Sequence, residues 1–151
     1  EPELSQQLGV VVLGSQAEQC KSLFPFPIYP MNYVSNEKEL VDIYNAVDLY
    51  VTPSLQDNLP NTIVEAMACG IPCVGFNVGG IPQMVDHLHN GYVAQYKSAD
   101  DLANGICWTL TEGDYETLSS EAYRKAVTTY SEATVASQYI QIYNHITGKN
   151  A

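Results

Sequence analysis

Short apolar runs alternate with amphipathic helical patterns along most of this chain. The runs at residues 8–13, 49–52 and 73–76 are too short for buried helices, and each contains valine. Such runs are typical of strands that are covered on both faces, as in parallel sheets. Their alternation with helices predicts an α/β fold in which right-handed crossovers join parallel strands. We therefore expect a Rossmann-like parallel sheet flanked by helices. The three runs should be its central strands, and residues 1–151 should form a single domain.

Local signals predict the other elements. Leu40, Ile43, Tyr44 and Val47 recur at i, i+3, i+4 and i+7, which indicates an amphipathic helix with Asn36 as its cap. Further strands are expected at residues 26–31 and 92–95, a short helix near Pro82, and helices at 61–69, 99–111, 115–129 and 132–146. The tyrosines of the last two helices recur at helical spacing, so we predict that they lie in the core.

The segment 57–80, DNLPNTIVEAMACGIPCVGFNVGG, is the most informative about function. It places two carboxylates, Asp57 and Glu65, on either side of a break at Pro60, with Glu65 expected in the first turn of the next helix. The loop leaves the carboxyl end of a strand, where open parallel sheets bind ligands. A helix entry presents backbone N–H groups and a positive dipole end, which bind phosphate. Because carboxylates accept hydrogen bonds from sugar hydroxyls, the segment suits a sugar nucleotide.

The same polar residues also have a structural interpretation. Thr62 and Glu65 have the spacing of a capping box, in which the glutamate reaches back to a backbone N–H group. Asp57 and Asn58 would then cap the helix or shape the turn before it. The spacing by itself favours capping over ligand binding.

Several glycines and histidines complete the set of notable residues. Gly70 is expected to end its helix in a left-handed conformation, and Gly79 and Gly80 to permit a tight loop and a close approach of backbone. His87 and His89 could form half of a metal site, but no third ligand is in view, so we interpret them as solvated and predict no metal.

Composition excludes several classes of partner. With 17 acidic and six basic residues, the formal charge of −11 argues against nucleic acid and anionic membrane surfaces. No apolar run approaches the roughly 20 residues that span a bilayer, so we expect no direct membrane insertion. Cysteines 20, 69, 73 and 107 lack a zinc or redox spacing and are expected to be reduced thiols in a cytoplasmic protein.

The order of these motifs resembles the donor-site signature of glycosyltransferase family 4, the retaining group 1 glycosyltransferases. That signature is an E-x7-E pair, then EAMA-x-G-x-P, then a GG-x-P-E loop. Here it reads Asp57-x7-Glu65, EAMACGIP at residues 65–72 and GGIPQ at residues 79–83. Segments 33–54 and 90–106 are similar to the family's flanking segments, so the resemblance covers nearly the whole chain. Asp57 and Gln83 depart from it, since the family usually has glutamate at both positions.

The resemblance implies the carboxyl-terminal half of a GT-B enzyme that transfers a hexose-type sugar from a UDP- or GDP-sugar with retention. It implies that Glu65 binds the ribose hydroxyls and that Asp57, the residue closest to catalysis, holds a hydroxyl of the transferred sugar. Backbone near Tyr33 and Val34 would contact the base. No cofactor or metal is implied, and the sequence has no D-x-D motif. The remaining donor-binding residues implied are Asn58, Leu59, Asn61 and Thr62.

The resemblance also implies parts that we do not find in the chain. The family's domain normally opens with a strand that carries an Arg and a Lys, which neutralise the departing diphosphate. None of the six basic residues of the chain is at a matching position. These residues are Lys21, Lys38, Lys97, Arg124, Lys125 and Lys149. The amino-terminal domain, which would bind a glycan or lipid-linked acceptor, is also absent. We therefore expect a donor domain truncated at its amino-terminal edge and inactive alone.

Two alternatives stay open. A GT-B-fold sugar-nucleotide epimerase would share the fold and the ligand, and would need acid and base carboxylates at the cleft. A non-enzymatic α/β binding or regulatory domain belongs to a different class. Signal receivers need clustered acidic residues after the first strand, and NAD-binding domains need G-x-G-x-x-G there. Gly14 and Ser15 provide neither pattern.

Overall fold

The structure is a computed structural model that describes residue 4 and residues 6–148. The chain divides into two compact units, Glu1–Val47 and Asp48–Ala151. Each unit holds a parallel sheet, with strand order β1-β2 in the first unit and β3-β4-β5 in the second. Parallel pairing throughout confirms the predicted α/β class.

The described part of the first unit contains a two-stranded sheet, which is followed by a helix of nine residues. Its elements are β1 (Val10–Leu13), the 3-10 helix η1 (Ala17–Ser22), β2 (Ile28–Met31) and α2 (Glu37–Asn45). Asn36 caps α2 as predicted, since its side chain accepts hydrogen bonds from the N–H groups of Lys38 at 2.9 Å and Glu39 at 3.4 Å. Ile43 and Tyr44 are the buried residues of α2, which agrees with its apolar periodicity.

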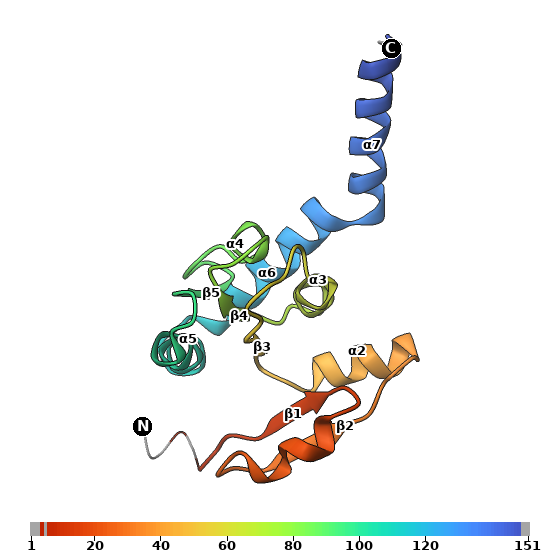
Figure 1. Ribbon diagram of the computed structural model, residues 1–151. Coiled ribbons are helices and arrows are strands. Elements are labelled where there is room, and N and C mark those ends of the chain that lie inside the picture. The colour runs from red at the N-terminus through yellow and green to blue at the C-terminus, as the bar shows by residue number, and fades with distance from the viewer. Residues whose placement is uncertain (1–3, 5, 149–151) are drawn as a thin grey trace. The chain divides into compact units, whose positions relative to one another are not determined.

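The second unit is a three-stranded sheet flanked by helices (Figure 1). Its elements are β3 (Tyr50–Thr52), α3 (Asn61–Ala68), β4 (Cys73–Phe76), α4 (Ile81–Met84), β5 (Gly91–Ala94), α5 (Ala99–Thr111), α6 (Tyr115–Tyr130) and α7 (Glu132–Thr147). Helix α5 packs on β4 and β5, and α3 packs on β4 and α6. The core consists of the buried faces of these helices and strands, with Ile63, Met67, Val74 and Ile81 fully buried.

The three apolar runs are parallel strands, but within residues 6–148 only one of them is a central strand. Among the described residues, β4 pairs on both sides, whereas β1 pairs with β2 and β3 pairs with β4. All four residues of β4 are buried, while β1 ends at the exposed Leu13. The prediction of three central strands was wrong because an apolar run reports cover on the faces of a strand, not the number of its neighbours in the sheet.

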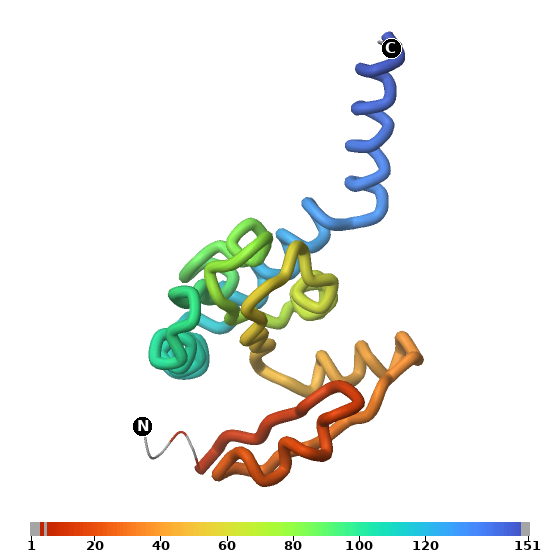
Figure 2. Tube along the Cα trace, in the orientation of Figure 1, coloured from red at the N-terminus to blue at the C-terminus, as the bar shows by residue number. Residues whose placement is uncertain are grey.

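Helices α6 and α7 are joined by a sharp turn of the chain, which the trace in Figure 2 follows. Ser131 lies at the turn with an extended ψ of 149°, and its hydroxyl oxygen accepts a hydrogen bond from the N–H of Thr134. The predicted core position of the tyrosines is wrong, since Tyr123, Tyr139 and Tyr143 are 54%, 57% and 61% exposed. Helical spacing identifies a shared face but not what covers it.

No helix within residues 6–148 combines the length and the apolar character that crossing a membrane would require.

Candidate functional site

The β3–α3 loop, residues 53–60, leads from the carboxyl end of β3 into α3. Pro60 is the N-cap of α3 and makes no side-chain cap hydrogen bond, so neither Asp57 nor Asn58 occupies the capping position. Thr62 is the second residue of the helix, which excludes the capping box with Glu65. Glu65 lies in the second turn, not the first as predicted. The helix begins directly after Pro60, because proline fixes φ and lacks an N–H group.

Tyr50 connects β3 to the first turn of α3. Its hydroxyl donates a hydrogen bond to Thr62 Oγ1 at 2.8 Å. Burial raises the pKa of Tyr50, the hydrogen bond to Thr62 lowers it, and the negative charges of Glu65 and Asp57 raise it further. Asp57 and Glu65 are both half-buried. The two carboxylates therefore act electrostatically on one tyrosine of β3.

The paired glycines after β4 lie directly against the β3–α3 loop. Gly79 has φ of +54°, and a Cβ atom there would lie 1.6 Å from the carbonyl oxygen of Asp57. A Cβ atom on Gly80 would lie 2.0 Å from the carbonyl oxygen of Asn58. Only glycine allows the two backbones to approach so closely, as predicted. The contact joins the two halves of the motif into one surface at the carboxyl edge of the sheet.

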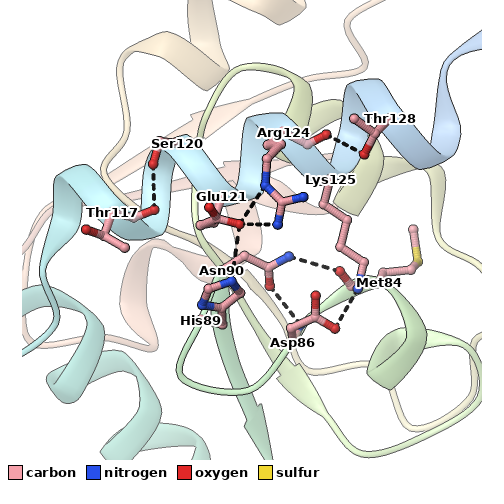
Figure 3. A network of polar contacts seen from close by, with 10 residues as sticks. All are labelled: Met84, Asp86, His89, Asn90, Thr117, Ser120, Glu121, Arg124, Lys125 and Thr128. Atoms are coloured by element: carbon pink, nitrogen blue, oxygen red, sulfur yellow. Dashed lines mark hydrogen bonds and ion pairs between the residues drawn. The ribbon is translucent and has the colours of Figure 1, made fainter.

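Helix α4 follows Gly80 and is tied to α6. The hydroxyl of Tyr130 donates a hydrogen bond to the carbonyl oxygen of Gln83 at 3.3 Å. Just beyond α4, Lys125 Nζ lies 2.6 Å from Asp86 Oδ1 (Figure 3). The segment that carries the paired glycines is therefore held by α6 at its far end.

The rest of this polar network shapes the loop between α4 and β5 (Figure 3). Asn90 is buried, and its side chain accepts from the N–H of Asp86 at 2.8 Å and donates to the carbonyl of Met84 at 3.3 Å. His89 Nε2 lies 3.2 Å from a carboxylate oxygen of Glu121, which also pairs with Arg124. These contacts give His89 a structural role.

His87 is also engaged locally, since its Nδ1 accepts a hydrogen bond from the N–H of Val93 at 3.1 Å. Within the described part of the chain, no group of three or more His, Cys, Asp or Glu side chains is arranged to hold a metal ion. Gly70 adopts φ of +74° at the end of α3, as predicted. All four cysteines are free thiols, and Cys73 is buried.

The turn after β5 is held by Asp101 of α5. One carboxylate oxygen accepts a hydrogen bond from the N–H of Gln95 at 2.6 Å, and the other accepts from the hydroxyl of Tyr92 at 2.9 Å. These bonds, the one from Gln95 foremost, hold the pKa of Asp101 below its usual range. The charged form of Asp101 is thus favoured in the folded chain.

We expect Asp101→Asn to lower the free energy of unfolding at neutral pH by about 1 kcal/mol, a modest figure because solvent screens the carboxylate. The native pKa is depressed, so this contribution is present above about pH 4 and is lost as the pH falls through the lowered pKa. Denaturation followed from neutral to acid pH checks it. Asp100→Asn, in the same helical turn, is the matched control, and an equal effect of both variants would contradict the prediction.

Tyr33 and Val34 belong to the first unit, in the segment between β2 and α2. Tyr33 is 84% exposed, and Val34 is half-buried. Asn58, Leu59, Asn61 and Thr62 are exposed around the entry to α3. Sequence reasoning missed Tyr50 and Tyr96, whose hydroxyls bond to Thr62 and Leu55. Their contacts join segments far apart in the chain, so no local pattern pointed to them.

The fold of the chain is that of the carboxyl-terminal half of a GT-B glycosyltransferase. Sucrose-phosphate synthase from Thermosynechococcus elongatus matches it with a TM-score of 0.78 at 22% identity, over 95% of this chain and 39% of the other. HepE from Anabaena, solved in complex with UDP-glucose, matches with a TM-score of 0.75 at 21% identity, over 92% of this chain and 41% of the other.

The chain belongs to the group 1 glycosyl transferases, whose family model matches residues 2–112. Among its relatives is the N-acetyl-alpha-D-glucosaminyl L-malate synthase of Bacillus anthracis, 27% identical over 112 residues. That match covers 74% of this chain and 29% of the relative, so the chain spans less than a third of the relative's length. The epimerase and the non-enzymatic alternatives are not favoured by these comparisons.

Proposed function

We propose that the chain is the donor-binding part of a nucleotide-sugar-dependent, retaining glycosyltransferase that transfers a hexose-type sugar. The observation that carries the proposal is the contact of Gly79 and Gly80 with the carbonyls of Asp57 and Asn58 at the entry to α3. It joins a helix entry without a side-chain cap, two half-buried carboxylates and a tight glycine turn at one sheet edge. A UDP-sugar is the favoured donor, because HepE was solved with UDP-glucose, and a GDP-sugar is the alternative.

Each residue has a proposed role in holding that donor. Glu65 accepts hydrogen bonds from the ribose hydroxyls, and Asp57 holds a hydroxyl of the transferred sugar. The backbone N–H groups of residues 58, 59, 61 and 62 meet the sugar and the diphosphate, supported by the positive end of the α3 dipole. That backbone near Tyr33 and Val34 contacts the base stays a prediction from the family resemblance. The donor is held without a metal or cofactor.

The proposed reaction exchanges one glycosidic bond for another on the same face of the sugar. The bond between the anomeric carbon and the diphosphate oxygen breaks, and the acceptor oxygen bonds to that carbon from the same side. The acceptor's proton passes to the departing oxygen, so no side-chain base is required. Hydrogen-bond donors that point at the departing diphosphate would lower the activation barrier by several kcal/mol, because negative charge develops there in the transition state.

Observations away from the candidate site support a proposal for the acceptor and for the cellular compartment. We propose that a glycan or lipid-linked acceptor is bound by a part of the protein other than this chain, in line with the share of its relatives that the chain spans. A reducing cytoplasmic compartment is supported by the four free thiols.

Ligand-detected NMR with UDP-, GDP- and ADP-sugars tests the proposed donor directly. If none of these sugars bound, the proposal would be refuted.

We expect the affinity of this chain for UDP to rise with added salt or to change little. The formal charge of −11 repels a diphosphate, and salt screens that repulsion beyond about 10 Å at 0.1 M. Isothermal titration at low and high ionic strength measures the trend. A marked loss of affinity with salt would contradict the prediction, because it would show that basic side chains dominate the binding of the diphosphate.

A further inference from the structure

The turn between β5 and α5, residues 95–98, holds the backbone of Tyr96 in a fixed conformation. The N–H of Ser98 donates to the carbonyl oxygen of Gln95 at 3.0 Å, which closes a four-residue turn. Lys97 occupies the third position with φ of +63°, a left-handed conformation for which glycine is the usual residue. Asp101 holds the first residue of the turn through the N–H of Gln95. Tyr96 is therefore presented from a rigid support.

Tyr96 reaches from this turn to the β3–α3 loop. Its hydroxyl donates a hydrogen bond to the carbonyl oxygen of Leu55 at 3.2 Å. Since β3 and β5 lie on opposite sides of β4, this bond spans the carboxyl edge of the sheet. The ammonium group of Lys97 lies 5.0 Å from the centre of the Tyr96 ring, within the range of a cation–π interaction. The lysine therefore restricts the ring whose hydroxyl makes the bond.

The bond fixes the part of the loop that the paired glycines leave free. Gly79 and Gly80 contact the carbonyls of Asp57 and Asn58, at the middle of the loop. Leu55 lies two residues before Asp57, on the strand side. With both contacts in place, the backbone is held immediately before and at Asp57, which limits the directions that its carboxylate can take.

We propose that Tyr96 is a positioning residue for Asp57, with Lys97 orienting the tyrosine ring. The inference rests on the proposed function, in which Asp57 holds a hydroxyl of the transferred sugar. It follows that Tyr96 acts on the sugar end of the donor and not on the nucleotide end. Loss of its hydroxyl should therefore separate the affinity for UDP-glucose from the affinity for UDP, which general destabilisation would not do.

The test is Tyr96→Phe in the full chain, which removes the hydroxyl and keeps the ring. Tyr123→Phe, at an exposed tyrosine of α6, is the matched control. The first measurement needs no ligand. Backbone 15N order parameters of residues 54–58 should fall from about 0.85 toward about 0.6 in Tyr96→Phe and stay unchanged in the control. The second measurement is isothermal titration with UDP-glucose and with UDP.

We expect Tyr96→Phe to weaken UDP-glucose binding about three- to tenfold, the effect of one lost neutral hydrogen bond, with UDP affinity nearly unchanged. Unchanged order parameters in residues 54–58 would overturn the positioning role, and so would an equal loss for both ligands. If the native chain bound neither ligand, the proposed function would fail for a uridine donor, and the proposal for Tyr96, which rests on it, would fall as well. The order parameters, which are measured without ligand, would still distinguish the two failures. They would fall in Tyr96→Phe if Tyr96 holds the loop and only the proposed donor is wrong, and they would stay unchanged if Tyr96 does not hold the loop.

Discussion

Gly79→Ala is expected to destabilise the second unit by about 3 kcal/mol and to disrupt the β3–α3 loop. At φ of +54°, any residue with a Cβ atom incurs a left-handed strain of about 1–2 kcal/mol. The added methyl group would also lie 1.6 Å from the carbonyl oxygen of Asp57. That contact is with backbone, so no rotamer change relieves it and one of the two segments must move. Forced overpacking of this kind costs about 1–3 kcal/mol.

Chemical denaturation, with titration of UDP-glucose beside it, measures both consequences. Gly70→Ala is the matched control, because Gly70 has a similar φ of +74° but its Cβ atom would lie 3.0 Å from the side-chain hydroxyl of Ser119 and no closer than 3.8 Å to backbone. We expect the control to lose about 1–2 kcal/mol from strain and to keep its ligand affinity. If Gly79→Ala were no worse than Gly70→Ala, the contact between the two loops would not matter energetically.

Glu65→Gln is expected to weaken the binding of UDP by about 1–3 kcal/mol, or roughly five- to 150-fold. A carboxylate that accepts hydrogen bonds from both ribose hydroxyls binds them more strongly than a neutral amide does. Its position in the second turn of α3 leaves the capping box unformed. A role in capping therefore does not predict this loss.

Isothermal titration with UDP, beside thermal unfolding, separates binding from stability. Glu112→Gln at the end of α5 makes the same change in net charge at an exposed position and should bind as the native chain does. In a protein that transfers sugar, Asp57→Asn should reduce turnover more than nucleotide affinity, since the proposed partner of Asp57 is the sugar that moves. Unchanged affinity in Glu65→Gln would remove Glu65 from the donor site.

The sequence by itself predicted most of the elements and the local devices that shape them. Asn36 as a cap and the left-handed Gly70 depend on interactions within a few residues, and the parallel strands were predictable because short apolar runs alternate with helices along the chain. The close approach at Gly79 and Gly80 was also predictable, because paired glycines at the end of a strand have few other uses. The family resemblance added the site residues, which spacing alone would have assigned to helix capping.

Only the tertiary structure decided how those elements combine. Local patterns could not tell that β4 alone among the described strands has two neighbours in its sheet. The bond between Tyr96 and Leu55 joins residues 41 positions apart. Periodicity and backbone preference act over a few residues, whereas such a contact depends on how the strands are ordered at the edge of the sheet. The sequence thus indicated which residues are candidates for the site, and the tertiary structure determined which contacts hold the backbone around them.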